Sequence, residues 1–66
     1  MGGGYPVQVL AVQAGDVALV EVAGRLREVV LSALPDPVVI AGDWLLVECG
    51  VALARIDADE ARTYDR

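Results

Sequence analysis

The sequence predicts an all-β fold: a small, closed or nearly closed barrel of about five antiparallel strands, followed by a short C-terminal helix. The 66 residues are 56% hydrophobic, and valine recurs from Val7 to Val51, so the apolar set is dominated by β-branched side chains that favour strands. Glycine-containing turn signals cut the apolar segments into short pieces at regular spacing. Closure of such a sheet hides edges that would otherwise aggregate.

Each strand is predicted from side-chain alternation between two turn signals. The predicted elements are strands over 7–13, 17–22, 25–31, 44–48 and 51–56, and a short apolar return at 38–40. Along the first strand Val7, Val9 and Ala11 share one face, and along the third Arg25 and Arg27 face outward. Two prolines, Pro35 and Pro37, end the third strand because proline cannot donate to a ladder.

The C-terminal segment changes from strand to helix periodicity. Asp57 followed by Glu60 has the layout of a capping box, which predicts a helix over 58–64. The length leaves room for one domain, 1–66, with a flexible glycine-rich N-terminus (1–4), a barrel (5–56) and a short helix and tail (57–66).

Composition and charge exclude several classes of function. The net charge is −5, with five arginines, no lysine and no histidine, which argues against nucleic acid and against an anionic membrane surface. Without histidine there is no His-based acid–base pair or triad, and no CxxC, P-loop or dinucleotide motif occurs. We therefore predict no enzymatic activity and no cofactor, and expect a protein that binds a partner. No signal peptide pattern or membrane span is visible, so the expected location is the cytoplasm.

Three groups of residues have both a functional and a structural interpretation. A nucleophilic Cys49 would need a nearby base or positive charge, but its neighbours are Glu48 and Gly50, so packing at a strand end is favoured. Capping is favoured over a cation site for the acidic group Asp57, Asp59 and Glu60. A cross-strand pair with Glu21 is favoured over an external carboxylate partner for Arg25 and Arg27.

Several segments together resemble the HypC/HupF family of hydrogenase assembly chaperones over nearly the whole chain. The matching segments, in chain order, are Pro6 with the 7–13 strand, Gly15-Asp16-x-Ala18-x-Val20, Gly24-x-x-Arg27-Glu28-Val29-x-Leu31, Gly42-Asp43-Trp44-Leu45-Leu46-Val47, Gly50-x-Ala52 and the acidic helix start from Asp57 to Arg62. Each segment is modest alone, and their order and spacing make the match fairly specific. The resemblance implies an OB-like barrel with a short C-terminal helix.

The same resemblance implies a role in [NiFe] hydrogenase maturation. Members of the family pair with a larger iron–sulfur maturation partner, help to assemble the iron that carries cyanide and carbon monoxide, and deliver it to the hydrogenase large-subunit precursor. On this hypothesis we predict that the partner contacts lie at Tyr5 and Pro6 and at the corner formed by Glu48, Cys49 and Gly50.

Two departures from the family pattern concern the candidate iron ligands. The working cysteine of the family is residue 2, which here is Gly2, and Glu48 stands where the family usually has histidine. A thiolate suits low-spin iron, and glycine offers no side chain. Cys49 would compensate only if the fold brings it near the N-terminus. We therefore predict no metal site, with iron handling impaired or lost.

The N-terminal departure has three possible origins: an engineered replacement, a misassigned gene start, or a divergent paralogue that keeps the docking barrel. Glu48 lies inside the domain, which favours the paralogue. The alternative function is a structural barrel that self-associates through exposed valine and leucine, because a mean hydropathy of +0.53 is high for a small monomer.

Overall fold

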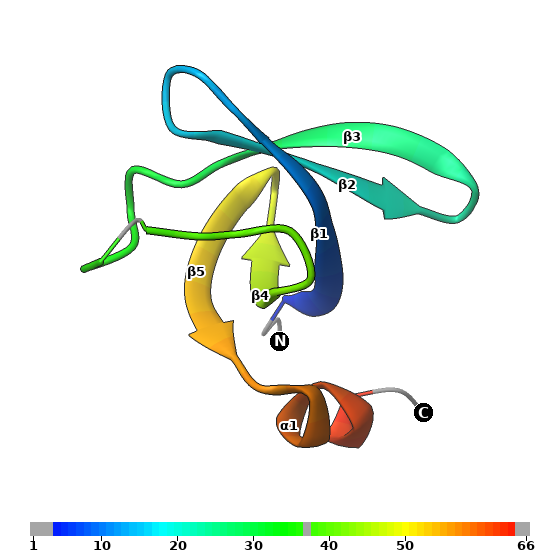
Figure 1. Cartoon of the computed structure of the whole chain (residues 1–66). Coiled ribbons are helices and arrows are strands. Elements are labelled where there is room, and N and C mark those ends of the chain that lie inside the picture. The colour runs from blue at the N-terminus through cyan, green and yellow to red at the C-terminus, as the bar shows by residue number, and fades with distance from the viewer. Residues whose placement is uncertain (1–3, 37, 65–66) are drawn as a thin grey trace.

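The computed structural model describes residues 4–36 and 38–64, and these form a closed barrel of five strands followed by one helix (Figure 1). The elements are β1 (Tyr5–Gln13), β2 (Val17–Val22), β3 (Arg25–Val30), β4 (Trp44–Glu48), β5 (Val51–Ile56) and α1 (Ala58–Thr63). Around the barrel the strands run in the order β1-β2-β3-β5-β4, and β4 pairs with β1 to close it. The predicted all-β barrel is confirmed.

Strand β1 pairs with a different strand along each half of its length, and this allows so short a chain to form a closed barrel. Its first half pairs with β4, from Tyr5 opposite Val47 to Gln8 opposite Trp44, and its second half pairs with β2. The register shifts between Val9 and Ala11, a bulge that bends the strand from one neighbour to the other. Val7, Val9 and Ala11 were predicted to share one face, but because of this shift Val7 and Val9 are buried whereas Ala11 is exposed.

One strand pair is parallel, whereas the sequence analysis expected antiparallel strands throughout. Val30 of β3 lies opposite Val51 of β5 in a parallel bridge, and the Val30 N–H donates to the Gly50 carbonyl at 2.9 Å. The reason is parity: strand direction cannot alternate all the way round a closed ring of five strands, so at least one neighbouring pair must be parallel.

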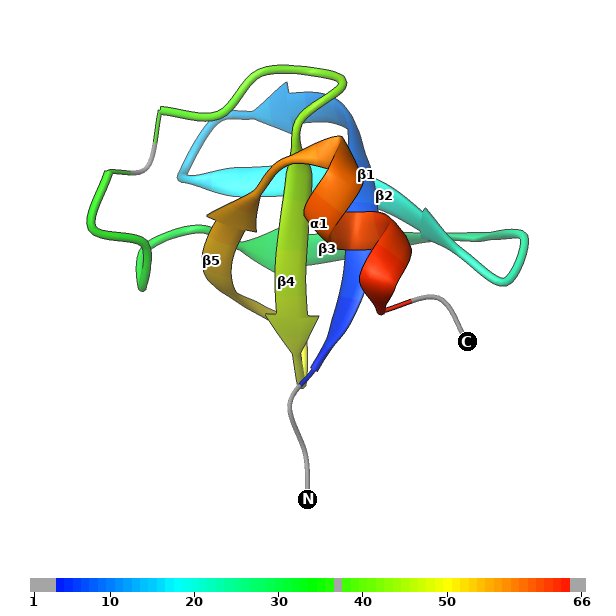
Figure 2. The same cartoon turned by 90° about the horizontal axis from the view of Figure 1, so that it is seen from below.

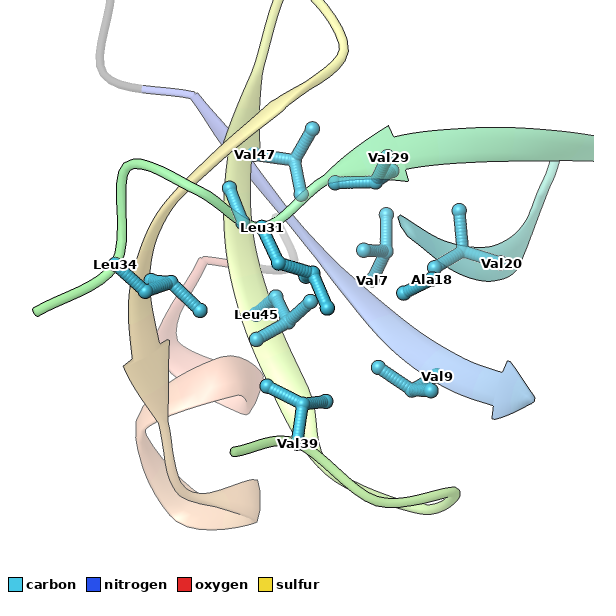
Figure 3. Packing of buried hydrophobic residues seen from close by; sticks show 11 residues of the cluster. Val7, Val9, Ala18, Val20, Val29, Leu31, Leu34, Val39, Leu45 and Val47 are labelled. Atoms are coloured by element: carbon cyan, nitrogen blue, oxygen red, sulfur yellow. The ribbon is translucent and has the colours of Figure 1, made fainter. Parts of the chain in front are cut away.

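The core fills the barrel with small aliphatic side chains from every strand (Figure 3). Leu31 and Leu45 are the largest of the fully buried side chains. The other members of the cluster are Val7, Val9, Ala18, Val20, Val29, Leu34, Val39, Val47 and Ala52. These strand residues alternate with exposed or half-buried ones, as the predicted two-residue period requires.

The segment at 38–40 enters the core without forming a strand. Val39 is buried, whereas Val38 and Ile40 on either side are exposed. Side chains hold this segment: Arg55 donates to the Val38 carbonyl, and the Asp43 carboxylate accepts from the Ile40 N–H at 3.1 Å. The predicted short apolar return is therefore a loop that contributes one core residue.

Helix α1 begins as the sequence predicts. The Asp57 side chain accepts a hydrogen bond from the Glu60 N–H at 2.8 Å, which satisfies one of the unpaired donors at the helix start. Asp59 forms an ion pair with Arg62, and Ala61 is buried against the barrel. The acidic group thus has the capping role that the sequence favoured.

Nothing in the described ranges 4–36 and 38–64 forms a helix of the length and apolarity that a membrane span requires.

Replacing Asp57 with alanine is expected to lower the free energy of unfolding by about 1 kcal/mol, because the cap is lost. Asp57→Asn should cost much less, since an asparagine side chain caps equally well. Urea unfolding followed by Trp44 fluorescence measures both variants. Equal losses for the two substitutions would show that the carboxylate charge, and not the capping hydrogen bond, matters here.

Candidate partner-binding site

The two predicted parts of the site lie side by side at one end of the barrel. Tyr5 is opposite Val47 and Pro6 is opposite Leu46 in the β1–β4 pair. Figure 2 shows the start of β1 meeting the end of β4. Since Glu48, Cys49 and Gly50 directly follow Val47, the fold brings the corner between β4 and β5 next to the N-terminal strand.

Gly4 fixes how the chain enters β1. Its φ is +77°, a left-handed conformation that side chains disfavour. A Cβ atom built on Gly4 would lie 2.7 Å from the carbonyl oxygen of Val47, closer than real contacts allow. The first described residue of the chain is thus held directly against the backbone at the end of β4.

The corner between β4 and β5 is a two-residue hairpin turn. Glu48 is opposite Val51, and the two residues between them both have positive φ, +55° for Cys49 and +79° for Gly50. This is the pattern of a type I′ turn, whose backbone twist matches that of the strands. Cys49 is exposed, so the predicted strand-end packing is wrong. The pairing of β4 with β5 ends at Glu48 and Val51, so Cys49 lies beyond the sheet and its side chain has no sheet face to pack on.

We expect Cys49→Asn to stabilise the protein by about 0.5 kcal/mol, because asparagine tolerates the left-handed conformation better than other non-glycine residues. Cys49→Val should destabilise it by about 1 kcal/mol, since a β-branched side chain is strained at positive φ. Thermal unfolding of the two variants is the measurement. If both shift the midpoint in the same direction, the turn conformation does not control stability at this position.

A cleft of about 350 Å³ opens beside these residues. Tyr5 and Gly50 form one side of it, and the hairpin of β2 and β3 supplies the rest. The hairpin residues are Val20, Val22, Arg27, Glu28 and Val29. In both views the tip of this hairpin projects beyond the barrel (Figures 1 and 2). Val20 and Val29 on its inner face are buried, whereas Arg27 nearer the tip is exposed. The predicted site did not include this hairpin, because a cross-strand pair with Glu21 was favoured over an external carboxylate partner for Arg25 and Arg27.

The arginines of β3 are placed differently from the prediction. Arg27 is opposite the buried Val20 and Arg25 is opposite Val22, so they continue the inner face of β3 instead of facing outward. Glu21 is opposite Leu26, on the other face, and the predicted pairing with Glu21 is wrong. Within 4–36 and 38–64 the ion pairs are Arg55 with Asp43 and Arg62 with Asp59, so Arg25 and Arg27 have no carboxylate partner there.

Of the two positions where the family resemblance leads one to expect iron ligands, 2 and 48, the structure describes only position 48. Gly2 lies outside the described residues. Glu48 is exposed at the end of β4, and Cys49 follows two residues after Val47, the partner of Tyr5, so the fold does bring Cys49 to the N-terminal end of β1. In the part of the chain that the structure describes, no three or more Cys, Asp or Glu side chains form a group that could hold a metal ion.

The closed ring of five short strands with one short helix defines the class: a small all-β barrel protein. Comparison with known proteins narrows the class. The model of the HupF/HypC family matches residues 1–66, and the chain belongs to that family.

Two relatives illustrate the similarity. The chain is 41% identical over 63 residues to hydrogenase maturation factor HybG of Escherichia coli K12, covering 89% of this chain and 77% of the relative. It is 35% identical over 57 residues to hydrogenase maturation factor HypC of Helicobacter hepaticus, covering 86% of this chain and 65% of the relative.

Proposed function

We propose that this protein is an accessory chaperone of hydrogenase maturation that acts by binding and not by catalysis. Its partner is the iron–sulfur maturation protein or the hydrogenase large-subunit precursor. Membership of the HupF/HypC family and the names of the two relatives support this role. The partner-binding residues are Tyr5, Pro6, Glu48, Cys49 and Gly50.

The observation that carries this assignment is the pairing of Tyr5 with Val47. It joins two segments that are more than 40 positions apart in the sequence into one exposed surface, with Tyr5 43% exposed. An exposed aromatic residue beside a cleft is the kind of anchor that protein interfaces favour, because it buries a large area at little conformational cost.

The test compares two tyrosines. Tyr5→Ala should reduce capture of the maturation partner or precursor from the source organism by about tenfold, the effect of losing an aromatic anchor. Tyr64→Ala is the matched control: Tyr64 is 41% exposed and directly follows α1. That helix begins just after Ile56, the partner of Trp44 at the start of β4, and so away from Val47. Equal capture by the two variants would refute the assignment of the site, and failure of the unaltered protein to capture either partner would refute the function.

We also propose that iron handling by this chain is impaired. A carboxylate at Glu48 replaces the imidazole that the family resemblance leads one to expect, and position 2 is glycine. Neither offers the soft thiolate or imidazole donor that such iron favours. The iron content of this chain, purified anaerobically with its partner and then separated from it, tests this proposal, and one equivalent of iron per chain would overturn it.

A second candidate is self-association as a structural subunit. It is favoured by the exposed apolar side chains of Leu26, Val38 and Ile40, each more than 60% exposed. Light scattering distinguishes the two functions: a stable ring or dimer that forms without any partner would favour self-association.

A further inference from the structure

One edge of β3 is left unpaired where it passes the cleft. On one side β3 pairs with β2 along its whole length, but on the other side it meets β5 only at Val30. The Val30 N–H points to that second side, where it donates to Gly50. Backbone groups of alternate residues point the same way, so the N–H and C=O of Leu26 and Glu28 also point away from β2. In the described part of the chain these groups have no hydrogen-bond partner.

The cleft lies along this free edge and suits the side chains of an added strand. Its inner surface carries Val20 and Val29, which belong to the buried core, while Gly50 and Tyr5 form the opposite side. A strand placed beside Leu26 and Glu28 would therefore continue the sheet in line with β5 and end at the turn between β4 and β5. Its apolar side chain opposite Val29 would enter the cleft.

Charge indicates what kind of strand fits. Arg27 and Arg25 lie on the inner face at successive alternate positions, with no ion-pair partner in 4–36 and 38–64. Side chains of an added strand that lie directly opposite them would be on the same face, where acidic groups are stabilised by the arginines. The complementary segment therefore has three inward-facing residues at every second position. The first is apolar and lies opposite Val29, and the next two are acidic and lie opposite Arg27 and Arg25.

A second copy of this chain is a poor occupant of the same edge. In a two-fold antiparallel pairing of β3 with itself, the register centred on Arg27 places Arg27 opposite Arg27, and the register centred on Glu28 places Glu28 opposite Glu28. The register centred on Leu26 places Arg25 opposite Arg27 twice. Like charges directly opposite each other destabilise a sheet, so these registers disfavour self-pairing and the occupant comes from a different protein.

We propose that the free edge of β3 accepts an extended segment of the partner protein as a sixth, antiparallel strand. Backbone groups of Leu26 and Glu28 bind the segment, its two acidic side chains pair with Arg25 and Arg27, and its apolar side chain enters the cleft beside Tyr5 and Gly50. This is recognition by strand addition, in which the backbone gives affinity and alternate side chains give specificity. The identity of the partner rests on the proposed function, whereas the strand-addition site does not.

The direct test uses a peptide and the whole chain. The probe is the blocked peptide Thr-Val-Thr-Glu-Thr-Glu-Thr, and the control is Thr-Val-Thr-Lys-Thr-Lys-Thr. Titration of the isotope-labelled protein with the probe should shift the amide resonances of Leu26 and Glu28 and slow their hydrogen exchange. The control should bind about tenfold more weakly, because its charges face the arginines. Equal binding of the two peptides, or shifts confined to other strands, would overturn the proposal.

Two sets of variants separate backbone from charge. Leu26→Pro removes the N–H on the free edge, whereas Leu26→Ala shortens the side chain and keeps that donor. Only Leu26→Pro should abolish peptide binding. The double variant Arg25→Glu with Arg27→Glu keeps the backbone donors and acceptors and reverses the charge. It should weaken binding of the acidic probe about tenfold. Arg62→Glu, the same change on exposed α1, should leave it unchanged. Full binding by both Leu26→Pro and the double arginine variant would contradict the proposal.

Capture of the maturation partner distinguishes this proposal from the proposed function. If the unaltered protein captures the partner and Leu26→Pro does so equally well, the strand-addition site is wrong and the proposed function stands. If the peptide binds as expected but the unaltered protein captures no maturation partner or precursor, the proposed function is wrong and the strand-addition site stands.

Discussion

Leu45→Ala is expected to leave most of the protein unfolded at 37 °C. Leu45 is 0% exposed and lies in the centre of the barrel core, in contact with no solvent (Figure 3). Removing a fully buried leucine side chain costs about 2–5 kcal/mol, because transfer energy is lost and a cavity remains. A barrel of this size has a total stability near the lower end of about 5–15 kcal/mol, so the loss approaches the whole margin.

The matched control for this prediction is Leu53→Ala. Leu53 lies in the neighbouring strand β5 but is 43% exposed, so the same chemical change removes far less buried surface. Urea unfolding followed by Trp44 fluorescence should give a loss below about 1 kcal/mol for Leu53→Ala. Similar midpoints for the two variants would mean that Leu45 does not occupy the core as described.

Gly4→Ala is expected to separate the N-terminal strand from β4. The new Cβ would lie 2.7 Å from the Val47 carbonyl oxygen, and because that atom belongs to the backbone it cannot simply rotate away. The left-handed conformation adds about 1 kcal/mol of strain for alanine. Relief requires Tyr5 and Pro6 to move away from Val47 and Leu46, which disrupts the proposed partner-binding site.

The control for Gly4→Ala is Gly15→Ala. Gly15 has a similar φ, +83°, but a Cβ built there meets no atom within 4 Å. Both variants should lose about 1 kcal/mol from backbone strain, and only Gly4→Ala should change the amide resonances of Tyr5 and Val47 and reduce partner capture. If Gly15→Ala reduces capture as much, the effect reflects stability and not the position of the N-terminal strand.

Local sequence patterns were sufficient to predict most of the elements. Strands β2, β4 and β5 begin and end where alternation and turn signals placed them, and Asp57 caps α1. Strand β1 begins at Tyr5, where the barrel was expected to start, and its first four residues pair with β4. No local signal reveals that pairing, since the partner strand is far away in the sequence.

The site was predicted only in part, for the same reason. Tyr5 and the corner at Glu48 were chosen from the family resemblance, and the fold places them side by side. The contribution of β3 depends on register: alternation shows that Arg25 and Arg27 share a face, but pairing with Val22 and Val20 decides that it is the inner one. The parallel bridge at Val30, by contrast, follows from the odd number of strands and was predictable.

The crossed strand order has a consequence for how the chain folds. The pairings of β1 with β2, β2 with β3, and β4 with β5 join neighbours in sequence and form by closing short turns. The pairings of β1 with β4 and of β3 with β5 join segments that are distant in the sequence. Bringing them together lowers the chain entropy before any contact between them forms to offset that loss. Barrel closure should therefore be the slow step of folding, on a timescale of about milliseconds to seconds, and the proposed binding end should be the last part of the molecule to assemble.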